Sequence, residues 1–402
     1  MNLWRHQVPA NSPVSAGAVL AGLGAVVRNG KASAQTEARV IELLSARYAP
    51  RDVVLTDSGT TALSAALLGV LKDRPGAPVA LPAYACYDIA TAADGAGARV
   101  LLYDLDPHTL APDMAQLRAA LRQGAAAVVI VHAYGYPVDV GEVQRLAAET
   151  GAVTIEDAAQ AAGASLNGRA TGTTASLAVL SFGRGKGLTG GSGGAVLAHD
   201  DAGARIVERA RSLLDAPRRG WPELLNIAAQ LVFQRPSLYA LPAAVPFLHL
   251  GETIYRKPKP MRRATSVSGR VVAATWRLAE SEARIRRRNA ERLLRVLRWE
   301  RGFETVHALG AAQPGYLRLP VLASPAARPL VDQPAARRLG VMPGYPKPLS
   351  ELPGFGARCV NRDADFPGSR LLAERLCTLP THGRLGTRDL ERLEAWIRSV
   401  GR

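Results

Sequence analysis

The chain is poor in cysteine. Its 402 residues include only 3 cysteines, and these form no Cys-x-x-Cys or Cys-x-x-His pair. An odd, scattered set of thiols supports neither a disulfide framework nor a zinc site, so we expect no metal centre, and it is typical of a reducing compartment. The first residues show no basic segment followed by an apolar one, so we expect no secretory signal and a cytoplasmic location.

Aromatic residues and long apolar runs are also scarce. Phe, Trp and Tyr make up 5% of the chain. They are not interleaved with basic residues, as they are in proteins that bind single-stranded nucleic acid, so we expect no nucleic-acid partner. No apolar run reaches the roughly 18–20 residues that a membrane-spanning helix needs.

Acidic residues are outnumbered by basic ones. The chain has 34 Asp and Glu against 50 Lys and Arg, which gives a net charge of +16. This excess favours anionic partners, such as a phosphate-bearing substrate or an anionic membrane surface. A hydrophobic share of 48% over this length predicts a globular chain of two domains.

Apolar, β-rich runs alternate with helical patterns through the first half of the chain. The strand-like runs lie at residues 53–55, 78–81, 99–103, 126–132, 152–155, 177–182 and 194–198. Helical patterns include residues 36–48, 62–71, 113–122 and 140–150. This alternation predicts a largely parallel sheet covered by helices, with functional side chains at the carboxyl ends of the strands.

A single lysine, Lys186, lies in a glycine-rich stretch directly after one of these runs. Residues 181–194 contain seven glycines. Glycine permits tight bends and the close approach of a ligand to the backbone, and a partly desolvated lysine amine can attack a carbonyl. The aldehyde of pyridoxal phosphate (PLP) is the obvious partner. An incidental surface lysine in a glycine-rich loop is the alternative.

Two further motifs follow strand-like runs. Ser58, Gly59 and Thr60 precede a helical pattern, where N–H groups and hydroxyls would bind a cofactor phosphate or simply cap the helix. Asp157 ends another run, where its carboxylate would pair with a pyridinium nitrogen or cap a helix. Its neighbour Glu156 would point to the opposite face and serve structure.

Two other strand ends carry less specific signals. The segment containing Tyr84 could lay a flat face on the cofactor ring, or it could pack in the core. His132 ends the run at residues 126–132. It would face the site or be a hydrogen-bonded structural histidine.

The order of these motifs resembles that of the DegT/DnrJ/EryC1/StrS aminotransferases, PLP enzymes of fold type I that mostly aminate nucleotide-linked keto sugars. The matching segments are Ser58-Gly59-Thr60-Thr61-Ala62-Leu63, Leu81-Pro82-Ala83-Tyr84, His132-x-x-Gly135-x-Pro137, Glu156-Asp157-Ala158-Ala159-Gln160-Ala161 and Ser181-Phe182-x-x-x-Lys186. The resemblance implies that Lys186 is the Schiff-base lysine, that Asp157 pairs with the pyridine nitrogen and that Ser181 binds the phosphate. The implied cofactor-binding residues are Ser58, Gly59, Thr60, Tyr84, Cys86, Asp157, Gln160, Ser181 and Lys186.

The resemblance also implies the architecture. We expect an α/β protein of PLP fold type I, with a large domain built on a mixed, mostly parallel sheet flanked by helices and a smaller α+β C-terminal domain. The expected divisions are an N-terminal arm at 1–30, a large PLP-binding domain at 31–255 with an apolar insertion at about 205–255, and a small domain at 256–402. The family's Gly-Tyr-Asn-Tyr-Arg segment, by which a partner subunit reaches the site, is replaced here by residues 259–266, which marks an outlying branch.

The implied function is the transfer of an amino group from an amino acid, expected to be glutamate, to a phosphate-bearing keto sugar, expected to be nucleotide-linked, in glycan synthesis by a homodimer. The candidate substrate residues are His132, Arg256, Arg262 and Arg263. The alternatives are a PLP-dependent sugar dehydratase, an aminotransferase for a lipid-linked or non-sugar ketone, and a non-catalytic PLP-binding regulator. We interpret the insertion as a lid or dimer element, ahead of a groove for a lipid-linked substrate or a contact with the inner membrane face.

Overall fold

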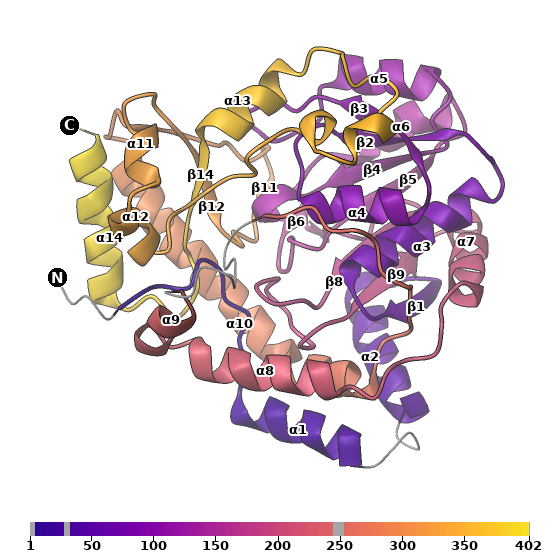
Figure 1. The fold of residues 1–402 in the computed structure, drawn as a ribbon, viewed down its shortest axis with the longest axis horizontal. Coiled ribbons are helices and arrows are strands. Elements are labelled where there is room, and N and C mark those ends of the chain that lie inside the picture. Colours follow the sequence, from indigo (N-terminus) through magenta and orange to yellow (C-terminus); the bar gives the residue numbers. More distant parts are fainter. Residues whose placement is uncertain (1–4, 28–32, 244–252, 402) are drawn as a thin grey trace.

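The computed structural model describes residues 5–27, 33–243 and 253–401. A seven-stranded sheet, in the order β1-β9-β8-β5-β4-β2-β3, forms the centre of the larger part (Figure 1). Its strands are β1 (Asp52–Thr56), β2 (Pro78–Pro82), β3 (Arg99–Tyr103), β4 (Ala127–Val131), β5 (Val153–Asp157), β8 (Leu177–Ser181) and β9 (Gly194–Ala198). Each coincides with a run that the sequence predicts, to within two residues at either end.

The sheet is mixed and mostly parallel, as predicted. Strands β3, β2, β4, β5 and β8 pair in parallel, whereas β9 is antiparallel to both β8 and β1. The pairing of β4 with β5 brings Val131 opposite Asp157 at their carboxyl ends. The parallel strands therefore end at one edge of the sheet, where ligands bind in α/β proteins.

Helices cover both faces of this sheet. Alternate residues of each strand point to opposite faces, and both faces are apolar, so each must be buried against helices. Val54 of β1 belongs to the core on one face, while Val53 and Leu55 pack with Val40 and Leu44 on the other. The first core contains residues of α3 (Gly59–Leu71), α4 (Tyr87–Gly95), α5 (Met114–Arg122), α6 (Val140–Ala148) and α7 (Asp201–Ser212). The second contains residues of α2 (Ser33–Tyr48) and α10 (Ser266–Leu297).

Helix α3 begins three residues before the predicted start at residue 62. Ser58 is its N-cap, and the Ser58 Oγ accepts a hydrogen bond of 3.0 Å from the N–H of Thr61. Gly59 and Thr60 therefore lie in the first helical turn, where N–H groups have no intrahelical partner. The helical pattern alone could not locate this start, because glycine and threonine are weak helix formers.

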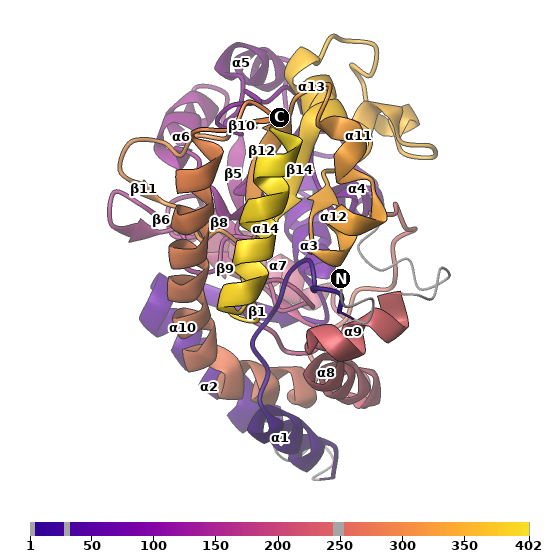
Figure 2. The ribbon, with the colours of Figure 1, turned by 90° about the vertical axis from the view of Figure 1, so that its left-hand side faces the viewer.

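A smaller part of the chain packs beside the sheet. Its four-stranded antiparallel sheet has the order β10-β12-β14-β13. These strands are β10 (Phe303–Thr305), β12 (Leu319–Ala323), β14 (Leu376–Leu379) and β13 (Met342–Pro343), and the associated helices are α11 (Arg328–Val331), α12 (Pro334–Arg338), α13 (Pro367–Arg375) and α14 (Thr387–Val400). Figure 2 shows α14 beside the long helix α10, which runs from this part to the larger one. The short strands β6 (Ser165–Leu166), β7 (Arg169–Ala170) and β11 (Ala312–Gln313) join the two parts, and the predicted domain boundaries stay a prediction.

Three helices extend the molecule beyond this core. They are α1 (Ala16–Val27), α8 (Trp221–Phe233) and α9 (Pro236–Ala243). Helix α1, from the predicted arm, lies along α8 and α10, and Gly22 allows the close approach: a Cβ there would lie 3.3 Å from Leu224 and from Val271 (Figure 1). Residues 244–252 of the predicted insertion lie outside the described residues. Within the described ranges, no helix combines the length and the apolar character needed to cross a bilayer.

Candidate active site

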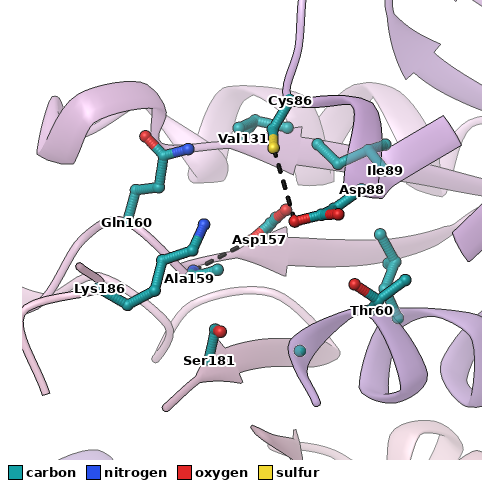
Figure 3. A pocket seen from close by; sticks show the side chains of 12 residues that line it. Thr60, Cys86, Asp88, Ile89, Val131, Asp157, Ala159, Gln160, Ser181 and Lys186 are labelled. Carbon is teal, nitrogen blue, oxygen red and sulfur yellow. Dashed lines mark hydrogen bonds between the residues drawn. The ribbon is translucent and has the colours of Figure 1, made fainter. Parts of the chain in front are cut away.

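A cleft lies where the carboxyl ends of β4, β5 and β8 meet the N-termini of α3 and α4 (Figure 3). It brings together most of the predicted cofactor-binding residues, although they come from four separate stretches of the chain. The predicted residues in its walls are Gly59, Thr60, Cys86, Asp157, Gln160, Ser181 and Lys186. Leu63, Asp88, Ile89, Val131 and Ala159 complete the lining.

One end of the cleft is shaped to accept an anion. Here the first turn of α3 faces Ser181, and we call this arrangement the phosphate cup. A Cβ on Gly59 would lie only 2.7 Å from the Cβ of Ser181, and one on Gly194 would lie 2.7 Å from the N atom of Gly59. Only glycines allow such close packing, and the helix dipole adds an attraction for negative charge. The cup therefore fits a cofactor phosphate.

Asp157 forms the floor of the cleft. Burial raises the pKa of its carboxyl group, and the N–H of Ala159 and the charge of Lys186 offset only part of that effect. Its Oδ1 accepts one hydrogen bond, of 3.0 Å, from the Ala159 N–H. A buried carboxylate with so few partners gains free energy from a cationic N–H donor. The protonated pyridine nitrogen of PLP is such a donor, so the floor of the cleft fits the ring.

Lys186 reaches into the cleft from a loop that requires glycine. Gly185 and Gly187 on either side have φ angles of 74° and 85°, in the left-handed region that other residues rarely adopt. The main-chain N–H of Lys186 donates a hydrogen bond of 3.1 Å to the Oγ of Ser12, which sequence reasoning did not identify. Figure 3 shows the Lys186 amine directed towards the space between Gln160 and Asp157. The lysine is thus fixed at its backbone while its amine is free to react.

Cys86 supplies a neutral surface at the start of α4. Burial and the nearby charge of Asp88 raise the pKa of its thiol to about 12, so the thiol is uncharged at neutral pH. A neutral sulfur behaves as a small, polarizable apolar group that can lie against a ring. Tyr84 points elsewhere: its hydroxyl accepts a 2.8 Å hydrogen bond from the N–H of Tyr345. The structure therefore places Cys86 in the cleft and Tyr84 behind it.

Gln160 connects the cleft to the smaller part of the chain. Its Oε1 accepts a hydrogen bond of 2.9 Å from the Tyr134 N–H, and its Nε2 donates one of 2.9 Å to the Tyr345 hydroxyl. The ring of Tyr345 stacks on that of Tyr134, with centroids 5.7 Å apart and planes 17° apart. Sequence reasoning missed Tyr345, because nothing near residue 345 signals contact with a strand end almost two hundred positions earlier.

Glu156 and His132 form a buried pair outside the cleft, which confirms that Glu156 points to the opposite face of β5. Burial by itself would raise the pKa of Glu156, but the hydrogen bonds that its carboxylate accepts, above all the one from His132, lower it below the usual value. His132 Nδ1 accepts a hydrogen bond of 3.1 Å from the N–H of Val138, so Nε2 carries the proton that it shares with Glu156. The four donors to the Glu156 carboxylate are His132 Nε2 and the N–H groups of Gly172, Thr174 and Ala175.

The three arginines predicted to bind substrate do not line the cleft. Arg262 donates a hydrogen bond of 3.3 Å to the Ala216 carbonyl, and Arg263 forms a bridge with Thr56 at the end of β1. Arg256 contributes its carbonyl to the Thr91 hydroxyl. Their role toward substrate stays a prediction, as does that of His132. Within the described ranges, no cluster of three or more His, Cys, Asp and Glu side chains could hold a metal ion.

Comparisons with known proteins agree with this geometry. The profile of the DegT/DnrJ/EryC1/StrS aminotransferase family matches residues 18–219. A dTDP-4-dehydro-2,3,6-trideoxy-D-glucose 4-aminotransferase of Saccharopolyspora spinosa is 37% identical over 41% of this chain and 42% of its own length. An L-glutamine:2-deoxy-scyllo-inosose aminotransferase of Streptomyces kanamyceticus is 32% identical over 58% of this chain and 57% of its own. The chain thus spans about half the length of the curated relatives it matches.

The resemblance in structure extends over nearly the whole chain. The aminotransferase TlmJ of Streptoalloteichus hindustanus has a TM-score of 0.75 and 25% identity, with 98% of each chain covered. Aminotransferases of the matching family depend on PLP, and the phosphate cup, Asp157 and Lys186 fit that cofactor. The profile match over half of the sequence, together with this fold, shows that the chain belongs to the DegT/DnrJ/EryC1/StrS aminotransferase family.

Proposed function

We propose that the protein is a PLP-dependent aminotransferase that transfers the amino group of glutamate to a keto sugar carried on a nucleotide, in the synthesis of a glycan. The observation that carries this proposal is the convergence of Lys186, Asp157 and the phosphate cup on one cleft. Each supplies a different part of a PLP site. The two curated relatives described above, whose names are those of sugar and cyclitol aminotransferases, support the substrate class.

The chain's own residues divide the chemistry among them. The first turn of α3 and Ser181 hold the phosphate, while the Asp157 carboxylate pairs with the ring nitrogen and keeps it protonated. When bound, PLP supplies an electron sink and a carbon that exchanges amino groups. The Lys186 amine would hold the cofactor aldehyde, and as a free amine it would be the base for the proton on the donor's α-carbon. Gln160, held by Tyr134 and Tyr345, would contact the ring from the wall of the cleft.

The absorbance spectrum tests this proposal. We expect the purified wild-type protein to bind PLP with a visible absorbance band, and we expect glutamate to bleach that band. Lys186→Ala should lack the band, whereas Lys72→Ala, which removes an exposed lysine at the end of α3, should keep it. A colourless protein that takes up no PLP contradicts the proposal. A band that ignores every amino donor favours a dehydratase or a non-catalytic role instead.

We further propose that two copies of the chain associate through α1 and α8. Large apolar side chains are exposed on these adjacent helices, and a partner subunit would cover them. They are Leu20, Leu23 and Val27 of α1 with Trp221, Leu225 and Val232 of α8. Light scattering of the wild type and of Leu225→Glu tests this: we expect a dimer and a monomer. A monomeric wild type, or a dimeric variant, contradicts the assignment of this face.

A further inference from the structure

A second cavity, of about 420 Å³, begins next to the lysine loop. Residues 8–12 line it, as do residues of α8 and α9 and the side chains of Arg184 and Arg318. Gly185, directly before Lys186, belongs to its lining, as does Ser12, whose Oγ accepts the Lys186 N–H at 3.1 Å. A ligand in this cavity would therefore lie beside the backbone of the loop that carries Lys186.

The charged side chains that line this cavity, Arg184 and Arg318, are both cations. Arg184 and Arg318 both face the Tyr239 hydroxyl closely enough to lower its pKa, although burial, the larger effect, raises it. No described Asp or Glu lines the cavity, and among the residues that the structure describes none forms an ion pair with Arg184. Two cations without an acidic partner attract an anion, and arginine suits phosphate and carboxylate oxygens in particular.

The interior of the cavity also contains donors that lack an acceptor. In the described part of the chain, neither Arg318 Nε nor Gln230 Nε2 has a hydrogen-bond partner, and both atoms are buried. The Arg318 Nη2 is engaged differently, since it donates to the carbonyls of Gly340 and Thr378 at 2.9 and 3.0 Å. A buried donor left unpaired costs free energy that an anionic ligand would recover.

We propose that this cavity binds the phosphate-bearing acceptor, with its phosphates between Arg184 and Arg318 and its carbonyl directed to Lys186. This inference rests on the proposed aminotransferase function and assigns its substrate site. The cavity volume lies within the range that encloses a nucleotide-sized ligand and exceeds what an amino acid needs. The rings of Phe233 and Tyr239 in its wall supply flat surfaces for a base. The helices of the insertion therefore act as a substrate wall rather than only as a lid or a subunit contact.

Calorimetric titration of the PLP-loaded protein with UDP, dTDP or inorganic pyrophosphate tests the assignment. We expect a nucleoside diphosphate to bind, and Arg184→Ala to weaken that binding about tenfold or more, as the loss of a charged hydrogen bond does. Gln230→Leu, which removes a donor but no charge, should weaken it less. Arg235→Ala is the matched control: it removes an exposed arginine that follows α8 and does not line the cavity.

The glutamate-driven loss of absorbance is recorded on the same samples. If nucleoside diphosphates do not bind the wild type, or bind Arg184→Ala and Arg235→Ala equally well, the assignment is overturned. If Arg184→Ala binds the diphosphate normally but no longer responds to glutamate, the cavity holds the donor carboxylate and the assignment is again overturned. Arg184-dependent diphosphate binding in a protein that never responds to glutamate would support the cavity and refute the aminotransferase proposal.

Discussion

Two adjacent carboxylates on β5 lead to opposite predictions for stability. Glu156 accepts four hydrogen bonds on one face of the strand, whereas Asp157 accepts one, from the Ala159 N–H, on the other. Replacing either by its amide keeps the size of the side chain and removes its charge. In Glu156→Gln an N–H₂ group must face donors that previously met an oxygen. In Asp157→Asn the amide oxygen can still accept the one hydrogen bond.

The magnitude follows from these contacts. Glu156→Gln sets two of the four donors against another donor, and breaking a buried charged network of this kind costs about 3–5 kcal/mol. For a chain of 402 residues, whose unfolding entropy is about 0.8 kcal/mol/K, this lowers Tm by roughly 4–6 °C. Asp157→Asn removes a carboxyl group whose pKa burial raises, so the protein without PLP should be as stable as the wild type or more stable.

Thermal unfolding of the PLP-free proteins, followed by circular dichroism, measures both effects. The pH dependence adds a check on Glu156: its folded-state pKa is lowered, so its contribution is present above the unfolded pKa and is lost as the pH falls through the folded one. The difference in Tm between wild type and Glu156→Gln should therefore shrink in acid. Equal losses of Tm in both variants, or no loss in Glu156→Gln, would refute the assignment of structure to Glu156 and chemistry to Asp157.

Three further predictions concern the cleft itself. Gly59→Ala should weaken PLP binding about fivefold or more, since its Cβ would lie 2.7 Å from that of Ser181 and such overpacking costs about 1–3 kcal/mol. Gly310→Ala, with open space around it, should leave PLP binding unchanged, and equilibrium dialysis measures both variants. Cys86 should react slowly with a thiol reagent at pH 8, because its pKa of about 12 leaves little thiolate, and rapid labelling would contradict that raised pKa. PLP affinity should fall as the pH drops through the raised pKa of Asp157, and titration of Asp157→Asn should show a weak, flat dependence instead.

The large sheet and the cofactor half of the site could be predicted because their signals are local. Each strand is a short apolar run, and the residue that does chemistry stands at its end or just beyond, as Asp157 and Ser181 do. The topology then carries these ends to one edge of the sheet without further information. The predicted start of α3 was three residues too late, because the helical pattern does not show that Gly59 belongs to the first turn. Glycine is required there by a tertiary contact, the close approach to Ser181.

The other half of the site could not be predicted, because no local pattern records it. Tyr345 reaches Gln160 from a proline-containing segment of the smaller part, and Ser12 reaches Lys186 from the N-terminal arm. Arg184 and Arg318 lie far apart in the sequence. They line one cavity because the fold places residues 8–12 and the helices α8 and α9 beside them. In the sequence, all four look like ordinary loop or surface residues, since their partners are set by tertiary packing alone.

The N-terminal arm links the two halves. Residues 8–12 form a wall of the second cavity, and Ser12 in the same segment accepts a hydrogen bond from the backbone of the lysine loop. His382 fixes the arm from the other side, because its Nε2 lies 2.7 Å from the Val8 carbonyl. A ligand that packs against residues 8–12 would therefore contact the segment that holds the backbone of Lys186 in place. In this arrangement substrate binding and the orientation of the reactive amine are not independent, since both depend on one short segment held between the two parts of the chain.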